Sequence, residues 1–287
     1  MNIYSSFSHR KQEPESGVLY LVGTPIGNLN DISSRALNIL KNVSLIACED
    51  TRQTKKIMNK YMITNNLISF NQHNSINKIP KIIEKIKAGK SIAIVSDAGM
   101  PSICDPGEDI VKAVRSEGFD VICIPGACAV ITALVSSGMP SSSFVFEGFL
   151  PKKKIDREKK LLEISQNEKT TILFESPHRL KNFLKELSLV CGEKREIIVL
   201  RELTKKYEEH IGNNIEEAIK YFEGKEIIGE ITIVIKGNSQ KRNLKFNESE
   251  LKKDLIDLVN AGLSLSSASK YLAHKTGIKK SLIYNLY

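Results

Sequence analysis

The sequence lacks the signals of several common protein classes. No apolar run is long enough to cross a membrane, and the start, Met1-Asn2-Ile3-Tyr4-Ser5-Ser6, has no apolar core of a secretion signal. The five cysteines are scattered, with no C-x-x-C pair and no histidine at zinc spacing. These absences argue against secreted, membrane-spanning and zinc-finger classes. They predict a cytoplasmic protein with free thiols and no metal.

Phosphate-binding motifs are also missing from the most informative loop, Gly23-Thr24-Pro25-Ile26-Gly27-Asn28-Leu29-Asn30-Asp31. It follows the apolar run Val18-Leu19-Tyr20-Leu21-Val22, which predicts a buried strand ending in a loop. Only two glycines stand where a dinucleotide fingerprint needs three, and no Gly-Lys-Ser/Thr of a P-loop follows. Because open α/β sheets bind ligands at the carboxyl ends of strands, the loop predicts a site whose ligand need not carry phosphate.

Two later loops have the same character. Apolar runs lead into Ser96-Asp97-Ala98-Gly99-Met100-Pro101 and into Pro125-Gly126-Ala127-Cys128-Ala129. Three loops rich in glycine and small residues would let backbone groups approach one ligand closely. The alternative is three ordinary turns between strands and helices.

Length and charge suggest a multidomain protein with an anionic partner. The 287 residues are enough for one large or two ordinary domains, and 42 basic against 33 acidic residues give a net charge of +9. Residues 241–287 carry nine basic and four acidic residues, so over half the surplus lies in this tail. A polyanion such as nucleic acid fits this surplus, and the alternative is a solvated lysine-rich surface.

The hydrophobic pattern predicts two α/β domains. Strand-like runs alternate with helical segments up to a turn-rich linker at 137–143, which indicates a largely parallel sheet. A second strand series follows, so we expect domains at 17–140 and 141–237, with a ligand cleft between them. Residues 1–16 are expected to form a disordered arm. The expected strands are 18–22, 43–47, 67–70, 92–95 and 121–124, then 144–146, 171–174, 197–200 and 231–235.

The sequence pattern of residues 238–287 predicts a small helical module. Asn247 and Glu250 have capping-box spacing, and Gly262 and Gly277 suit helix ends. Short helices with basic residues resemble a helix-turn-helix and favour nucleic-acid binding, although a hairpin that only packs on the body gives the same pattern. The first helix would pack through Leu251, Leu255, Leu258 and Val259, the second would span 265–274, and Lys279-Lys280-Ser281 would begin the third.

A series of motifs carries a family resemblance. The first loop continues through Asp31-Ile32 and Arg35-Ala36-Leu37, and the two later loops also match. With these motifs and those listed below in the same order, the chain resembles the ribosomal small-subunit methyltransferase I proteins of the tetrapyrrole methylase superfamily, over about residues 19–235. Met100 departs from the usual threonine, and 71–74 is a loose version of a His-containing loop. Further matches are Cys48-Glu49-Asp50-Thr51-Arg52, Asp105-Pro106-Gly107, Phe146-Glu147-Gly148-Phe149-Leu150-Pro151, Glu175-Ser176-Pro177-His178-Arg179 and Arg201-Glu202-Leu203-Thr204-Lys205-Lys206.

The resemblance implies S-adenosylmethionine-dependent 2′-O-methylation of a cytidine in 16S rRNA near the decoding centre, by a homodimer. It also implies two α/β domains of the tetrapyrrole methylase type with the cofactor between them. Asp97 could accept hydrogen bonds from the cofactor, or it could only cap a turn. The residues expected around the cofactor are Ile26, Asp97, Ala98, Gly99, Met100, Cys128, Ala129, Phe174 and Leu203.

Methyl transfer needs alignment and help in removing the hydroxyl proton. The candidate bases are Glu49, Asp50, Glu147 and Glu175. The candidates for holding RNA are Arg52, Arg179, Lys205, Lys206, Lys279 and Lys280. Each acid and arginine could equally form a structural ion pair, and His73 and His178 lack the clustered partners of a metal site. The competing interpretations are a methylase of a small tetrapyrrole or related metabolite and a nucleic-acid-binding protein without activity.

Overall fold

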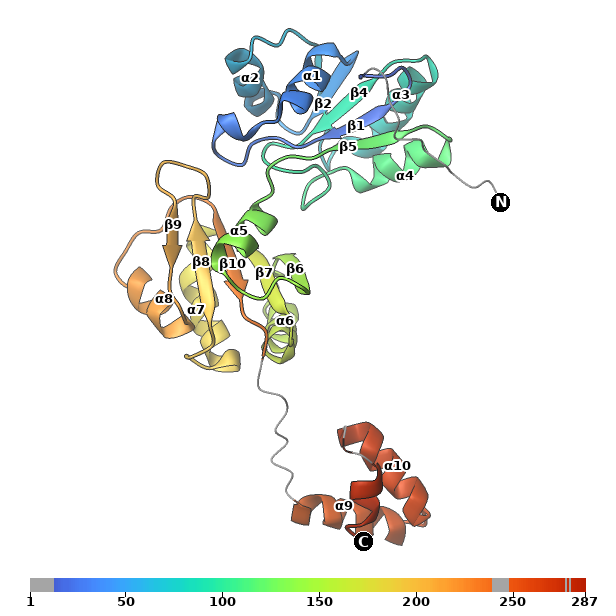
Figure 1. The fold of residues 1–287 in the computed structure, drawn as a ribbon, viewed down its shortest axis with the longest axis vertical. Coiled ribbons are helices and arrows are strands. Elements are labelled where there is room, and N and C mark those ends of the chain that lie inside the picture. The colour runs from blue at the N-terminus through green and yellow to red at the C-terminus, as the bar shows by residue number, and fades with distance from the viewer. Residues whose placement is uncertain (1–12, 239–247, 277, 279) are drawn as a thin grey trace. The chain divides into compact units, whose positions relative to one another are not determined.

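The computed structural model describes residues 13–238, 248–276, 278 and 280–287. The chain divides into two compact units, Met1–Gly237 and Asn238–Tyr287, and each is described by itself. The first unit contains two α/β domains, each built on its own sheet (Figure 1).

The first sheet is fully parallel. Its five strands lie in the order β3-β2-β4-β1-β5. Leu19 pairs with both Ile92 and Val121, so β1 lies between β4 and β5. The bounds are β1 (Leu19–Val22), β2 (Leu45–Cys48), β3 (Leu67–Ser69), β4 (Ile92–Val95) and β5 (Val121–Ile124). The expected parallel arrangement is confirmed.

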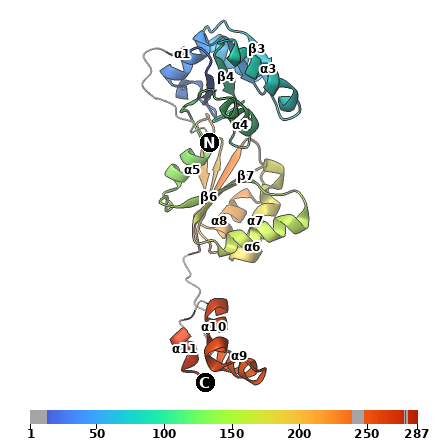
Figure 2. The same ribbon diagram turned by 90° about the vertical axis from the view of Figure 1, so that its right-hand side faces the viewer.

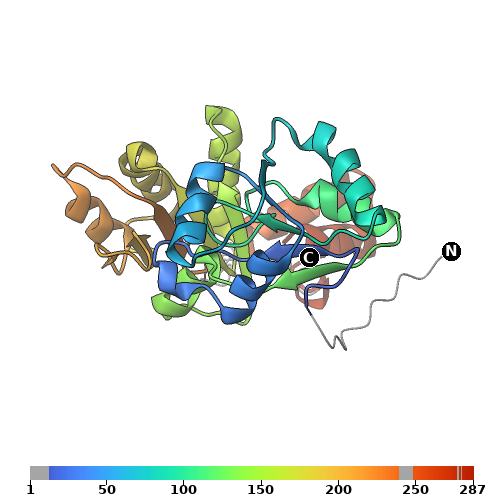
Figure 3. The ribbon, with the colours of Figure 1, turned by 90° about the horizontal axis from the view of Figure 1, so that it is seen from above.

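Helices cover both faces of this sheet because its strands are apolar on both sides. One face, with Tyr20 and Val22, packs against α1 (Ser34–Asn42) and α2 (Thr51–Lys60). The other, with Leu19, packs against α3 (Ser75–Lys87) and α4 (Glu108–Ser116). Figure 3 shows the two layers, blue for α1 and α2, teal and green for α3 and α4. A 3₁₀ turn, η1 (Leu29–Asp31), precedes α1.

The second sheet is mixed, in the order β6-β7-β10-β8-β9. Only β6 and β7 run parallel, and the other neighbours are antiparallel. Its strands are β6 (Phe144–Phe149), β7 (Thr170–Glu175), β8 (Ile197–Arg201), β9 (Glu209–Ile211) and β10 (Ile231–Ile235). The sequence pattern did not predict β9.

Different helices cover the two faces of the second sheet (Figure 2). One face packs against α6 (Lys154–Gln166), α7 (Pro177–Cys191) and α8 (Ile215–Phe222). The other packs against α5 (Ala129–Ser137). A boundary at residue 140 would cut α5 from the sheet that it covers, so the structure places α5 with the second domain.

The expected disordered arm is only partly described. Residues 1–12 lie outside the described residues. For 13–16 the expectation is wrong, because Glu13 forms an ion pair with Arg35 at 2.6 Å and the Ser16 hydroxyl donates to the Gly89 carbonyl. This short segment therefore lies on the first domain.

The C-terminal unit is a three-helix module with its own small core. Its helices are α9 (Glu248–Asn260), α10 (Leu265–Thr276) and α11 (Lys280–Tyr284). The core contains Leu255, Leu272 and Ile283, and Leu258 and Val259 pack against it. Gly262 has φ +100° just after α9, where glycine is favoured. The proposed cap residue Asn247, Gly277 and Lys279 lie outside the described residues, as does the Glu250 side chain.

Candidate active site

Backbone hydrogen bonds join the three loops identified in the sequence. The Gly23 N–H donates to the Ile124 carbonyl at 3.1 Å, which ties the first loop to the end of β5. Thr24 and Gly99 exchange two N–H to carbonyl bonds of 2.9 and 3.1 Å. The loops after β1, β4 and β5 are thus one connected wall, because these strands are neighbours in the sheet.

Glycine is required where two of these loops touch. A Cβ on Gly23 would lie 2.7 Å from the Gly126 Cα, and a Cβ on Gly126 would lie 2.8 Å from the Gly23 Cα. Both distances are shorter than real Cβ contacts, and backbone atoms cannot turn aside. Any side chain at either position would force the loops apart.

A cavity of about 380 Å³ lies against this wall. The first domain contributes the loops, and the second contributes the carboxyl end of β7 and the start of β10. Most of the lining is apolar or small. The lining residues are Ile26, Ala98, Gly99, Met100, Ile103, Cys104, Asp105, Cys128, Ala129, Val130, Phe149, Phe174, Glu175, Ser176, Pro177, Gly229, Glu230, Ile231 and Thr232.

The structure brings most of the residues expected around a cofactor to this cavity. Asp97 and Leu203 do not line it. Leu203 is buried beside Ile26 in the core below, and Asp97 accepts a 2.9 Å hydrogen bond from the Asp50 N–H. Those that line it are Ile26, Ala98, Gly99, Met100, Cys128, Ala129 and Phe174.

Carboxylates gather at the ends of β2 and β4, next to the cavity. Burial raises the pKa of Asp105 to about 6, with the charge of Glu49 as the second cause. Burial, then the charge of Asp97, raises the pKa of Glu49, and burial also raises that of Asp97. Asp50 differs, because a hydrogen bond from Arg52 lowers its pKa. Of these four acids, only Asp105 lines the cavity.

The other two candidate bases are engaged elsewhere. The Glu175 side chain has no exposed surface, and it lies 3.1 Å from the Arg179 Nε and accepts from the Ser176 N–H at 2.7 Å. Side chains alternate along a strand, so Glu175 points to the α6 and α7 face while its neighbour Phe174 faces the cavity. Glu147 pairs with Lys160 at 3.1 Å. Glu147 therefore does not line the cavity, and Glu175 lies in its wall with a side chain that has no exposed surface.

The basic residues expected to hold RNA are dispersed. Arg52 is exposed and paired with Asp50 at 2.6 Å, whereas Arg179 is partly buried beside Glu175. The Lys206 ammonium lies 5.3 Å from the centre of the Tyr207 ring. In the C-terminal unit, Lys280 donates to the Ser266 hydroxyl at 2.8 Å, and Lys279 lies outside the described residues.

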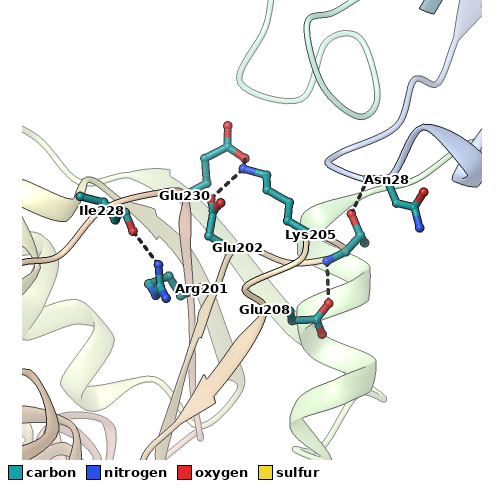
Figure 4. A network of polar contacts seen from close by, with 8 residues as sticks. Asn28, Arg201, Glu202, Lys205, Glu208, Ile228 and Glu230 are labelled. Atoms are coloured by element: carbon teal, nitrogen blue, oxygen red, sulfur yellow. Dashed lines mark hydrogen bonds and ion pairs between the residues drawn. The ribbon is translucent and has the colours of Figure 1, made fainter. Parts of the chain in front are cut away.

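A polar network holds the first loop to the second domain (Figure 4). The Asn28 N–H donates to the Thr204 hydroxyl at 3.0 Å, and the Thr204 N–H donates to Glu208 at 2.6 Å. Lys205 bridges Glu202 and Glu230 at 2.7 and 3.0 Å. A Cβ on Gly27 would lie 2.5 Å from the Lys205 Cγ, so this glycine permits the approach.

Sequence reasoning missed several lining residues. Asp105 and Phe149 belong to motifs that carried the resemblance, which was the available signal, but neither was selected as a site residue. Gly229 and Glu230 follow no recognisable motif, and the pairing of β10 with its neighbours β7 and β8 brings them here. Within the described part of the chain there is no group of three or more His, Cys, Asp or Glu side chains arranged for a metal ion. The same residues include no helix that could span a membrane.

Comparison with known proteins decides the family. Residues 18–219 match the family of Tetrapyrrole (Corrin/Porphyrin) Methylases. The chain belongs to this methylase family. Within it, the chain is 43% identical over 270 residues to a Synechocystis protein named ribosomal RNA small subunit methyltransferase I, covering 94% of this chain and 97% of that one. The Bacillus subtilis protein of the same name is 42% identical over 280 residues, 95% and 94% of the two chains. The family resemblance seen in the motifs is confirmed.

A Thermotoga maritima relative with the same name is shorter. It is 46% identical over 221 residues, which cover 99% of that protein but 77% of this chain. It therefore has no room for a further module the size of residues 238–287.

Solved structures support the fold. A cobalt precorrin-4 methyltransferase has a TM-score of 0.59 at 16% identity, covering 77% of this chain and 95% of its own. A Thermus thermophilus uroporphyrin-III C-methyltransferase complexed with S-adenosylhomocysteine has a TM-score of 0.53 at 15% identity, covering 75% and 96%. The predicted fold, two α/β domains with C-terminal helices, is confirmed.

Proposed function

We propose that this protein transfers a methyl group from S-adenosylmethionine to the 2′-oxygen of a cytidine ribose in small-subunit ribosomal RNA. The observation that carries the proposal is the cavity at the ends of β1, β4 and β5, in a chain whose relatives are named for methylating that RNA. The cytidine and its 2′-oxygen come from the motif resemblance.

The cavity suits this methyl donor. S-adenosylmethionine carries an adenine, a sulfonium and an ammonium but no phosphate, and the wall likewise lacks a phosphate-binding motif. Ile26, Met100 and Ala129 offer apolar surface for adenine and thioether, while Gly99 exposes backbone. Glu49 and Asp97, next to the cavity at the ends of β2 and β4, favour a cationic group there by simple attraction.

Asp105 is the carboxylate best placed to take the hydroxyl proton. Three carboxylates line the cavity, but Glu175 has no exposed side-chain surface and Glu230 is tied to Lys205. A base works best when its pKa lies near the working pH, and the pKa of Asp105 is raised to about 6. When bound, S-adenosylmethionine supplies an electrophilic methyl group. The 2′-oxygen bonds to that carbon as the carbon–sulfur bond breaks, the electron pair stays on sulfur, and Asp105 accepts the proton.

The C-terminal module adds affinity for RNA in this proposal. Lys252, Lys253, Lys270 and Lys280 are exposed on it, and neutralising phosphates with lysines gives binding that weakens with salt. The shorter Thermotoga relative bears the same name. Chemistry is therefore assigned to residues before 238, and binding of the ribosomal subunit is shared with the module.

The partners and location follow from the same proposal. The protein acts in the cytoplasm, where ribosomal subunits are assembled. We assign it a homodimer, since α5 exposes 46% of Ile131 and 74% of Val135, apolar surface that a second copy would cover. A monomeric mass by light scattering at micromolar concentration would contradict the dimer.

The test uses labelled S-adenosylmethionine and 30S subunits that lack the modification. We expect label on one cytidine ribose of 16S rRNA, and little on a short oligonucleotide, because RNA of this kind is recognised by its folded shape. Label on a base, on another RNA or only on a tetrapyrrole would contradict the proposal.

A further inference from the structure

Phe149 is an exposed aromatic ring in the cavity wall. It ends β6, keeps 57% of its surface exposed and lines the cavity with Cys104 and Asp105. An aromatic side chain in this position leaves much apolar surface in water, although burial of such a ring stabilises a fold. The ring is therefore available to a ligand.

A β-bulge turns this ring toward the cavity. Phe146 pairs with Ile172 and Phe149 with Phe174, so three steps on β6 match two on β7. Without the extra residue, Phe146 and Phe149 would point to opposite faces. Gly148 makes the bulge with φ +61°, a conformation that favours glycine, and its Cβ position lies 3.3 Å from the Cys104 Sγ. The local backbone thus re-aims one side chain.

The bulge gives Phe149 an aromatic support. Its ring centre is 5.6 Å from that of Phe174, which is 5.0 Å from that of Phe146. Phe146 and Phe174 pack against the core beneath, whereas Phe149 does not belong to that cluster. Phe149 is thus braced on one side and exposed on the other.

We propose that Phe149 is a stacking platform for the nucleobase of the target nucleotide, unstacked from the RNA. This inference rests on the proposed function, and it adds the subsite that holds the base beside the ribose. Single-stranded RNA is read by stacking bases on aromatic rings, and a base on Phe149 would bring its ribose toward the same cavity as Asp105. The platform is sequence-tolerant by itself, since every base has a π-face, so it positions the nucleotide without selecting cytosine.

Kinetics on unmodified 30S subunits test the platform. F149A should lower kcat/KM by roughly 5- to 150-fold, the range for loss of one stacked base. F149Y should retain activity, whereas F149L, which keeps apolar bulk without a π-face, should lose nearly as much as F149A. The affinity for S-adenosylmethionine should stay unchanged in all three. F144A is the matched control, because Phe144 is 36% exposed on the same strand and does not line the cavity.

Fluorescence of a tryptophan at position 149 tests directly whether a base stacks there. The chain contains no tryptophan, so F149W introduces a single reporter. We expect unmodified 30S subunits to quench the F149W protein strongly and the F144W protein little.

The outcomes separate the inference from the function on which it rests. Wild-type rates in both F149A and F149L would overturn the platform, as would a matching loss of affinity for S-adenosylmethionine, which would assign the ring to the cofactor instead. If the wild-type protein transfers no methyl group to 30S subunits, the proposed function fails before any variant is compared.

Discussion

Replacing Asp105 by asparagine should stop methyl transfer and, at neutral pH, stabilise the folded protein. Loss of the base removes a carboxylate that accepts the proton, so kcat should fall about 10²- to 10⁴-fold. Affinity for S-adenosylmethionine should change little if the side chain acts on the hydroxyl. The same substitution removes a partly buried charge, which is where the stability change originates.

The size of that change follows from the pKa. Burial and the charge of Glu49 raise the pKa of Asp105 from 3.8 to about 6 in the folded protein. At pH values above both pKa values, a shift of this size corresponds to about 3 kcal/mol against the folded state. Asp105 is only partly buried, so solvent screening reduces this to about 1–1.5 kcal/mol. For a protein of this size, D105N should raise Tm by about 2–6 °C.

The direction of the Asp105 pKa shift predicts how the Tm difference between D105N and wild type depends on pH. The folded state holds the Asp105 proton more tightly than the unfolded state, so ionisation destabilises the fold only as pH rises past about 4 toward 6. The Tm difference between D105N and wild type should therefore be largest near neutral pH and should disappear near pH 4. D109N is the matched variant, since Asp109 lies exposed in the first turn of α4. It should leave activity unchanged and lower Tm slightly, because an acid in the first turn of a helix stabilises that helix.

The pH dependence of the rate gives an independent readout. Activity requires ionised Asp105, so kcat on 30S subunits should rise with pH through about 6. E49Q should move this limb to lower pH but leave it above the usual range of an aspartate, because burial remains the larger cause of the raised pKa of Asp105. Wild-type kcat in D105N would show that Asp105 is not the base, and a Tm change that is the same at both pH values would show that its pKa is not raised in the folded protein.

Three further outcomes are expected. G23A should abolish binding of S-adenosylmethionine in calorimetry, because the new Cβ would lie 2.7 Å from the Gly126 Cα and force two loops apart. T204V should weaken that binding about 2- to 10-fold, since it removes the 3.0 Å bond from the Asn28 N–H that ties the first loop to the second domain. Deleting residues 241–287 should weaken binding of 30S subunits and reduce its dependence on salt in filter binding, while cofactor affinity persists.

A control variant exists for G23A, and each of the three predictions has a result that would contradict it. G118A introduces a Cβ with nothing within 4 Å at φ +81°, so it should cost stability without affecting cofactor binding. If G23A binds the cofactor normally, the loops do not form the cofactor wall. Cofactor binding by T204V at wild-type strength would show that the bond between Asn28 and Thr204 does not support the cofactor site. Unchanged 30S affinity in the truncated protein would show that the C-terminal module does not contribute to RNA binding.

The sequence predicted the first sheet well because its strands are apolar runs, continuous in the buried strands β1, β2 and β4. Val18-Leu19-Tyr20-Leu21-Val22 and the runs before the two later loops could be placed almost to the residue. The short edge strand β9 was missed, since Glu209–Ile211 has only three residues and is held by pairing with β8. A strand of three residues is too short for the two-residue alternation that marks a strand to be recognised.

The candidate site was partly predictable for a related reason. Small residues in the loops after β1, β4 and β5 marked one wall, because the ends of neighbouring parallel strands meet. The role of the acids could not be read from their types. Glu175 and Asp105 both stand in motifs, but strand alternation turns Glu175 to the α6 and α7 face while the loop leaves Asp105 at the cavity. The bulge that exposes Phe149 depends likewise on the register with β7.

The position of the transferred methyl group tests the proposed 2′-O-methylation most directly. Unmodified 30S subunits are incubated with the purified full-length chain and labelled S-adenosylmethionine, and the labelled nucleotide is mapped by nuclease digestion and mass spectrometry. We expect one cytidine of 16S rRNA to be methylated on the ribose 2′-oxygen, and D105N to label it at least about 10²-fold more slowly. Methylation of a base, or of that ribose at full rate by D105N, would contradict this expectation.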